Sequence, residues 1–429
     1  MDFSLSSSLV GSAVSNPDKL ALDLQFAADK TLTARKGPTP AFTRGSAGRF
    51  VGSDGLIQTA GNGVARFEYD QLTLACKGLL IEESRTNLVL QSEDFSTTWQ
   101  VNAASIANNV TVAPNGLTTA DLLNDIATSA AHQVIQSVGS LTAGQSYTFS
   151  VFAKAATHTS FQMTFSTAAF GSGLFANFVL TGSGSIGTSS GVVSKIESYL
   201  NGWYRCSITV VAATGGTGGF VQIAANNNNS SAARLVPYLG TNTQVVNLWG
   251  SQLEAGLFAS SYIPTTSGTA IRSADVCSIT GSAFSGMYNQ PEGTFVTSSS
   301  KTSTNSNAFI GHYSDNSFSN GFDVRYNTST QVSPLMNVAN SNQLTGMQVT
   351  ITAGSVVNQA FSYKLNDCGY SVNGAETITD TSALIPTATR MAIGHTALAS
   401  PSLYLNGTIS SMRYFKKRLA NSKLKALTV

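Results

Sequence analysis

Short stretches in which apolar and polar residues alternate recur along the chain. In the clearest, 203–210, the even-numbered residues are Tyr, Cys, Ile and Val, and the odd-numbered residues are Trp, Arg, Ser and Thr. The stretches 147–151 and 161–166 alternate in the same way. Because successive side chains of a strand point to opposite faces, each stretch predicts a strand with one apolar and one polar face. Glycine-rich breaks at 181–184 and 214–219 separate such strands, and this spacing predicts a β-sandwich.

Turn residues and phase changes predict further elements toward both ends of the chain. Asp-Gly at 54–55 lies between strand-like runs and predicts a hairpin, and Asn-Gly at 373–374 predicts a tight primed-type turn. The run 405–415 predicts a strand with a bulge near Ser410, where the apolar positions fall out of phase. The run 117–130 is compatible with a strand or with a short helix. The sequence shows no heptads and no short regular repeats, which argues against a coiled-coil stalk or a β-helix.

The composition supports a β protein with a neutral, polar surface. Charged residues make up 11% of the chain, against roughly 25% in ordinary domains. Ser, Thr, Asn and 38 glycines take the place of the missing charge, since the apolar fraction of 42% is close to ordinary. The net charge is +2, and the densest basic run is only 416–418. Such a chain lacks the basic surface that binding to nucleic acid requires, so we expect no nucleic-acid partner.

The cysteines and the N-terminal residues bear on the compartment. The cysteines lie far apart without a Cys-x-x-Cys pair, at Cys76, Cys206, Cys277 and Cys368. Two disulfides are formally available, but we expect buried free thiols in a protein made in a reducing cytosol. The first eight residues lack the basic start and apolar core of a signal peptide. No apolar run reaches the ~18 residues of a membrane-spanning helix, so we expect no membrane insertion.

Several unusual phrases occur in order along the first part of the chain. They are Phe-Thr-Arg (42–44), Ser-Asp-Gly (53–55), Arg-Phe-x-Tyr-Asp (66–70), Gly-Leu-Leu-Ile-Glu-Glu (78–83), Gly-Trp-Tyr-Arg (202–205) and the run 248–266 that ends in Tyr-Ile-Pro-Thr-Thr. This order resembles virion proteins of tailed bacteriophages, of the tail-fibre or head-fibre type. Their jelly-roll module is similar to the carbohydrate-binding jelly rolls of bacterial polysaccharide enzymes.

The resemblance extends to the last part of the chain and completes a predicted architecture. Strands, an Asn-Gly hairpin, an Asn-Gly-x-Ile strand at 406–409 and a Leu-rich tail resemble a concanavalin-like or laminin-G-like sandwich. We therefore expect an all-β protein with tandem β-sandwiches after a small β-rich section. Residues 1–86 would be an anchoring or bridging section, 87–265 the carbohydrate-binding-like jelly roll, and 266–429 the concanavalin/laminin-G-like sandwich.

The acidic residues and histidines do not form a recognisable catalytic pattern. Glycoside hydrolysis requires two carboxylates about 5–9.5 Å apart, and concanavalin-like glucanases place them on a Glu-x-Asp-x-x-Glu strand that is absent here. The adjacent acids at 82–83 and 93–94 would point to opposite faces of a strand. No histidine lies in a nucleophile motif or has a zinc-type spacing: His132, His158, His312 and His395. We therefore expect that the protein is not an enzyme.

An exposed aromatic ring beside polar donors is the pattern that would bind a sugar. Trp203 shares its strand face with Arg205, and a loop near 226–231 adds Asn228 and Asn229. These four residues are the candidate ligand-binding residues. The competing interpretation is that the Trp203 face packs against a neighbouring domain or subunit.

A structural calcium ion is the one cofactor that the resemblance to carbohydrate-binding jelly rolls suggests. The acids near the first and last strands of that module, Glu93, Asp94 and Glu254, are the candidate ligands. The competing interpretation is that these acids are simply solvated. Apart from this ion, we expect no cofactor.

The resemblance implies a bacteriophage virion structural protein, assembled in the host cytoplasm. It would be a surface-exposed fibre or receptor-binding component that contacts host-surface glycans and other virion proteins of the tail or capsid. The alternatives are a capsid decoration or head-fibre protein bound to the major capsid protein and, less favoured, a polysaccharide depolymerase. By analogy with phage fibres we expect a homo-oligomer, with a trimer as the first form to test.

Overall fold

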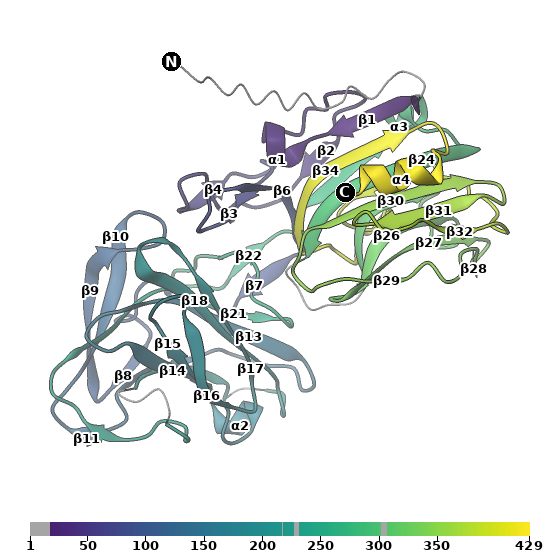
Figure 1. Cartoon of the computed structure of the whole chain (residues 1–429). Helices are drawn as coiled ribbons and strands as arrows, with labels where there is room; N and C mark the ends of the chain where they lie inside the picture. The colour runs from purple at the N-terminus through teal and green to yellow at the C-terminus, as the bar shows by residue number, and fades with distance from the viewer. Residues whose placement is uncertain (1–17, 217, 227–230, 302–306) are drawn as a thin grey trace, which may run out of the picture.

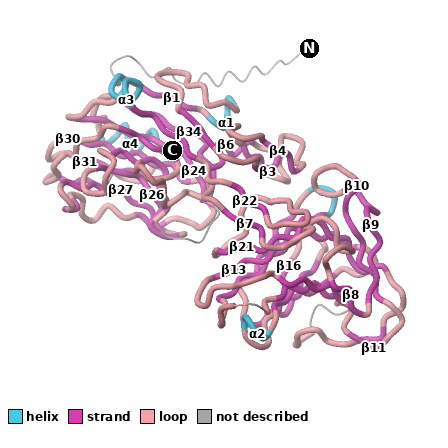
Figure 2. The backbone as a smooth tube through the Cα atoms, turned by 180° about the vertical axis from the view of Figure 1, so that it is seen from behind, coloured by secondary structure: helices cyan, strands magenta, loops and turns pink. Residues whose placement is uncertain are grey.

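The structure confirms the prediction of an all-β protein with tandem β-sandwiches. It is a computed structural model that describes residues 18–216, 218–226, 231–301 and 307–429. Figures 1 and 2 show two strand-rich bodies with β7 (Arg85–Asn87) and the paired β22 (Ala270–Arg272) between them. The helices are short: α1 (Phe26–Asp29), α2 (Thr167–Phe170), α3 (Gly281–Met287) and α4 (Asn421–Leu427). Among the described residues, no helix is both long and apolar enough to span a membrane.

The first sandwich packs two six-stranded antiparallel sheets face to face. One sheet has the order β17 (Val193–Ser198), β18 (Trp203–Val211), β13 (Ser146–Ala155), β21 (Gln244–Ala255), β10 (Thr118–Asp125) and β9 (Ala104–Val112). The other has the order β16 (Ser185–Ser190), β15 (Phe175–Val179), β14 (Ser160–Phe165), β19 (Phe220–Ala225), β12 (Gln133–Ser137) and β8 (Gln100–Asn102). Their inner faces bury apolar side chains such as Phe149, Phe161 and Ile208. A two-stranded pair, β11 (Ser129–Ala130) with β20 (Tyr238–Leu239), lies at one end.

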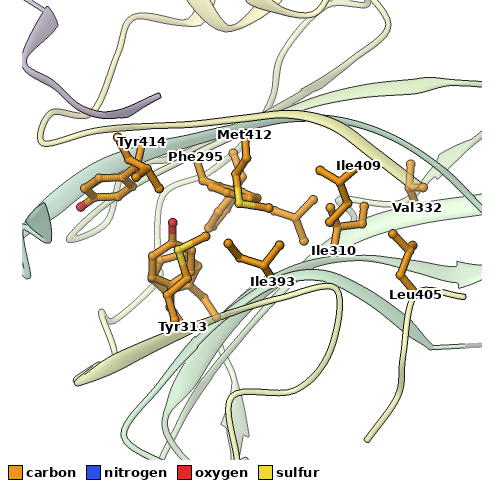
Figure 3. Close-up of a cluster of buried hydrophobic side chains, with 14 of the residues drawn as sticks. Phe295, Ile310, Tyr313, Val332, Ile393, Leu405, Ile409, Met412 and Tyr414 are labelled. Carbon is orange, nitrogen blue, oxygen red and sulfur yellow. The ribbon is translucent and has the colours of Figure 1, made fainter. Parts of the chain in front are cut away.

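The second sandwich is built from both ends of the chain. One sheet has the order β32 (Ile378–Asp380), β31 (Cys368–Val372), β30 (Val357–Lys364), β24 (Glu292–Lys301), β34 (Gly407–Phe415), β6 (Cys76–Ile81) and β5 (Phe67–Tyr69), with β1 (Leu20–Leu24) also on β34. The other has the order β2 (Ala41–Thr43), β23 (Val276–Thr280), β33 (Arg390–Ile393), β25 (Ala308–Ser314), β26 (Gly321–Thr328), β27 (Gln331–Val338) and β28 (Ser341–Asn342), with β29 (Val349–Thr350) on β27. Figure 3 shows the apolar core between the sheets, including Phe295, Ile310 and Met412.

The predicted separation of residues 1–86 from 266–429 differs from what the structure shows. β1 and β6 both pair with β34, and β2 pairs with β23, so the opening section supplies strands to both sheets of the second sandwich. Leu22 and Leu79 are fully buried in the same core as Phe295. The physical reason is that β34 pairs with β24 along one edge, and β1 and β6 pair with its other edge, whose backbone groups would otherwise lack partners. The hairpin of β3 (Gly48–Val51) and β4 (Ile57–Ala60) then projects from this section toward the first sandwich.

The local turn and bulge predictions are confirmed. β3 and β4 pair across the Asp-Gly turn, and Asn373 and Gly374 both have positive φ angles, of 48° and 73°, as a primed turn requires. Ser411 pairs with Ser298 while Ile409 pairs with Ser299, so Ser410 is the extra residue of a bulge. The ambiguous run 117–130 contains β10, a strand.

Candidate functional site at the joint between the sandwiches

Trp203 does not form the exposed sugar platform proposed from its strand pattern. It is 2% exposed and packs in a cluster with Phe152, Trp249 and Tyr262, which Ile57 of the opening section also joins. Its indole Nε1 donates a hydrogen bond to the Val112 carbonyl at 3.0 Å. The alternation placed Trp203 on the outer face of the sheet, as expected. That face is covered by the neighbouring part of the chain, so the ring is not available to a sugar.

Arg205 is held firmly on the same outer face. Its Nη1 donates to the Ser260 carbonyl at 2.7 Å, its Nη2 donates to Ser150 Oγ at 3.2 Å, and its guanidinium lies 5.3 Å from the ring centre of Phe152. Arg205 therefore ties the β18 strand to the segment that leaves the first sandwich. The two remaining candidates, Asn228 and Asn229, lie outside the described residues.

The three acids proposed as calcium ligands do not converge on one point. Glu93 accepts a hydrogen bond from the Tyr262 hydroxyl at 2.9 Å, and Asp94 accepts one from the Ser96 backbone N–H at 2.9 Å. Glu254 is fully buried, and Ser260 donates to it from both its backbone N–H and its hydroxyl. In the described parts of the chain, no three Asp, Glu, His or Cys side chains gather as a metal site would need. These residues do not fit a calcium ion.

A network of buried charges lies where the two sandwiches meet. Asp275 accepts Arg44 Nη1 at 3.1 Å and Arg66 Nη2 at 2.5 Å, and all three side chains are fully buried. It also accepts the Glu82 backbone N–H at 2.9 Å. Buried charges are stable only when they are paired and hydrogen-bonded. Arg44, Arg66 and Glu82 belong to the opening section, whereas Asp275 lies more than 190 residues later along the chain. The network therefore joins the opening section to the start of the third section.

Glu82 extends this network to the segment that leaves the first sandwich. Its carboxylate accepts Arg66 Nη1 at 2.7 Å, the Ser261 backbone N–H at 2.8 Å and the Ser261 hydroxyl at 2.7 Å. Arg272 Nη1 lies 3.4 Å away. Burial by itself would raise the pKa of Glu82, but Arg272, Arg66 and the Ser261 hydrogen bonds outweigh it and lower the pKa to about 2. Glu82 is thus a permanent anion that holds the connecting segment in place.

We call this network of buried charges the ionic joint; it consists of the side chains of Arg44, Arg66, Glu82, Arg272 and Asp275. The sequence patterns place Arg44, Arg66 and Glu82 inside family phrases, and they test Glu82 further only as half of an adjacent acid pair, so none of the three is given a structural role. The available signal was that three charged residues lie inside apolar, strand-like phrases of a charge-poor chain. Their partners come from distant segments, which no local pattern reveals.

A cleft opens beside the ionic joint, between the opening section and the outer face of the first sandwich. Its volume is about 270 Å³. One wall carries Glu68 and Lys77, and the other carries Lys195, Glu197 and Tyr199. The sequence-predicted Arg205 also lines the cleft, and the lining includes several apolar side chains: Phe50, Val51, Ile57, Leu80, Phe152, Val193, Leu257 and Phe258. The cleft therefore combines ring and aliphatic surfaces with charged donors and acceptors from two parts of the chain.

Glu68 is the acid of the cleft whose pKa is raised far above its ordinary value. Burial raises its pKa to about 7, although the Val51 N–H, 3.1 Å from Glu68 Oε2, opposes the shift. Burial also raises the pKa of the Tyr199 hydroxyl, and Glu197 adds to this effect. Near neutral pH, Glu68 can therefore either donate or accept a hydrogen bond, and Tyr199 keeps its proton.

Comparison with known proteins gives no family for this chain. No protein-family model matches the sequence, and no curated protein matches it. Partly similar solved structures include a carbohydrate-binding module of a Ruminococcus gnavus sialidase, with 14% identity over 34% of this chain and 88% of that chain and a TM-score of 0.30. Another is the NanB sialidase of Streptococcus pneumoniae, with 17% identity over 35% of this chain and 26% of that chain and a TM-score of 0.31.

A third similar structure is domain 4 of an extracellular arabinanase from Geobacillus stearothermophilus, solved with arabinotriose. It shares 13% identity over 40% of this chain and 82% of that chain, with a TM-score of 0.31. These TM-scores are too low to assign a family, a ligand or a site to the protein. Its architecture and its candidate site therefore rest on its own strands and side chains.

Proposed function

We propose that the protein binds glycans without cleaving them, as a surface-exposed structural component of a bacteriophage virion. The observation that carries the binding proposal is the cleft of about 270 Å³ beside the ionic joint. Its volume is just below the roughly 300–1,000 Å³ of sites for drug-sized ligands, and it suits one or two sugar units. Tyr199 and Phe258 offer apolar surface for a sugar face, and Lys77, Lys195 and Glu197 offer partners for hydroxyl groups.

The proposal of a virion protein rests on the sequence rather than on the cleft. It rests on the resemblance of the ordered phrases to tail-fibre and head-fibre proteins, and the charge-poor, polar composition suits a particle surface. We propose assembly in the host cytoplasm, contacts with other tail or capsid proteins, and a homo-oligomer, first tested as a trimer. Immunogold labelling of purified virions tests the location. Label at the tail tip supports the fibre proposal, whereas many copies over the head support the decoration alternative.

The depolymerase alternative deserves a test because of Glu68. A carboxyl group with a pKa of about 7 in a cleft is suited to act as a general acid. Hydrolysis also requires a second carboxylate, and the other acids of the cleft are already engaged. Both oxygens of Glu82 accept short hydrogen bonds and ion pairs, and Glu197 is paired with Lys195 at 2.9 Å. Incubation with host capsule or lipopolysaccharide should release no reducing ends; release that disappears in Glu68→Gln would establish hydrolysis.

A glycan array tests binding at the cleft. The wild type, Tyr199→Ala and Lys195→Ala are compared with Lys364→Ala, which removes an exposed cation outside the cleft lining. We expect the wild type and Lys364→Ala to bind the same glycans and the two cleft variants to bind at least tenfold more weakly. Absence of binding by the wild type, or equal binding by all four proteins, would remove the glycan proposal.

A further inference from the structure

A groove lies along β27, at one edge of the second sandwich (Figure 1). Two short strands pair with this edge: β29 pairs with residues 331–332, and β28 pairs with residues 337–338. Between them the chain leaves the strand, so no described strand pairs with residues 333–335 on this side. The groove lies at this gap and has a volume of about 320 Å³, within the roughly 300–1,000 Å³ of small-molecule sites.

Pro334 is suited to its place in the gap. Along an antiparallel strand, the N–H and C=O groups of alternate residues point to the same side. The Met336 carbonyl accepts the Gln343 N–H at 2.7 Å on the β28 side, so Pro334, two residues earlier, faces that side as well. Proline has no N–H to leave unpaired. The strand edge therefore needs no partner strand here, and the space beside it stays available to a ligand.

The segment that forms the outer wall of the groove is fixed in place. Asp380 Oδ2 accepts the Thr345 N–H at 3.2 Å and the Thr345 hydroxyl at 3.3 Å. The Leu344 N–H donates to Asn342 Oδ1 at 3.1 Å, and the side chains of Leu344 and Met347 are buried in the core of the second sandwich. A groove with walls held in this way loses little conformational freedom when it binds a ligand.

The lining of the groove combines apolar surface with side-chain amides. The apolar part includes Pro334, Leu335 and Met347, and the amides include Asn327, Gln331 and Gln348. Asn327 Oδ1 accepts the Ser333 hydroxyl at 2.9 Å, but its NH₂ group has no hydrogen-bond partner among the described residues. The amides of Gln331 and Gln348 have none there either. Each amide can donate two hydrogen bonds and accept others, which matches the hydroxyl groups of a sugar ring.

The charge of the groove does not call for an ionic ligand. Among the described residues that line it, only Arg325 is charged. Its Nε lies 3.5 Å from Oδ1 of the buried Asp323, and its guanidinium lies 5.6 Å from the ring centre of Phe309. Burial raises the pKa of Asp323 to about 7, although Arg325 opposes the shift. Above this pH the pair of Arg325 and Asp323 carries no net charge.

We infer that this groove on the second sandwich binds an uncharged saccharide. The amides of Asn327, Gln331 and Gln348 would bind its hydroxyl groups, and Leu335 would contact an apolar face of the sugar ring. The groove shares no lining residue with the cleft beside the ionic joint. The inference therefore does not depend on glycan binding in the cleft.

The test is an array of neutral and acidic oligosaccharides, probed at pH 8 with increasing concentrations of the full chain. Every protein carries Tyr199→Ala, which weakens the cleft, so that the remaining binding reports the groove. Gln331→Ala and Gln348→Ala are added singly to this background, and Gln100→Ala is the matched control, because it removes an exposed amide from β8 in the first sandwich. We expect saturable binding of neutral glycans by the background protein and the control, and at least tenfold weaker binding by each groove variant.

Gln331 and Gln348 make no side-chain hydrogen bond to the described chain, so their removal should leave the thermal midpoint unchanged. If one of the two variants does not fold, the other decides alone. The inference would be overturned if the background protein bound no neutral glycan, if it bound acidic glycans only, or if the groove variants bound as tightly as the Gln100→Ala control. None of these results bears on the cleft, which Lys195→Ala and Tyr199→Ala test against the wild type.

Discussion

The core of the second sandwich and the ionic joint are equally buried but chemically opposite. Phe295, Ile310 and Met412 are fully buried among other apolar side chains, while Arg66 and Asp275 are fully buried among charges. Apolar packing is non-directional, so it tolerates substitutions that keep volume and shape. A buried ion pair tolerates none that removes one partner, because the other charge is left uncompensated. The core therefore provides stability, and the joint specifies how the segments fit together.

The largest effect should come from removing the central anion of the joint. In Asp275→Asn, Arg44 and Arg66 lose the charge that both of them contact. Loss of one partner from a buried pair typically costs about 3–5 kcal/mol of the free energy of unfolding. Urea unfolding measures this loss.

The matched control for Asp275→Asn is Asp29→Asn, which breaks the surface pair with Arg35. This pair should contribute only about 0–1 kcal/mol. Equal losses in the two variants would contradict the distinction between buried and surface charges.

A smaller effect should follow from trimming the apolar core. Ile310→Val removes one methyl group from a fully buried site in the second sandwich, at a cost of about 1 kcal/mol. The same unfolding assay measures it. If Ile310→Val lowered the free energy of unfolding as much as Asp275→Asn, the core and the ionic joint would not differ in how well they tolerate substitution.

Glu68 in the cleft should make the free energy of unfolding depend on pH. The folded pKa of Glu68 is about 7, against an ordinary value of 4.5, so the folded state holds the proton more tightly. The stability that depends on this proton is present below pH 4.5 and is lost as the pH rises through about 7. Glu68→Gln should remove this decline relative to the wild type, as urea unfolding at pH 5 and pH 8 would show. Parallel curves for the two proteins would contradict the assigned pKa.

Local features of the fold were predictable from the sequence because their causes are local. The Asn373-Gly374 turn needs two positive φ angles, and the phase slip near Ser410 marks a bulge, so both can be read from a few neighbouring residues. The pairing of β1 with β34 could not be predicted, since it joins opposite ends of the chain. The alternation of apolar and polar residues within a strand does not show which distant strand will pair with it.

The candidate site was predictable only in part, for the same reason. Alternation correctly separated the Trp203 face from the apolar face of β18. It left two interpretations of that face open, a sugar platform and a packing surface, and the structure shows the packing surface, with Ile57 and Tyr262 beside Trp203. Likewise Glu82 and Asp275 look like scattered acids in the sequence, because their partners become visible only when three distant segments meet.

We propose that the ionic joint makes the two sandwiches one cooperative unit. Cys206 in the first sandwich and Cys277 in the second are both fully buried, so each thiol reports when its sandwich opens. Thiol labelling in increasing urea, read by mass spectrometry, measures the two openings in one sample. We predict a single shared midpoint for Cys206 and Cys277. Labelling of one cysteine at a clearly lower urea concentration, while the other stays protected, would contradict the claim.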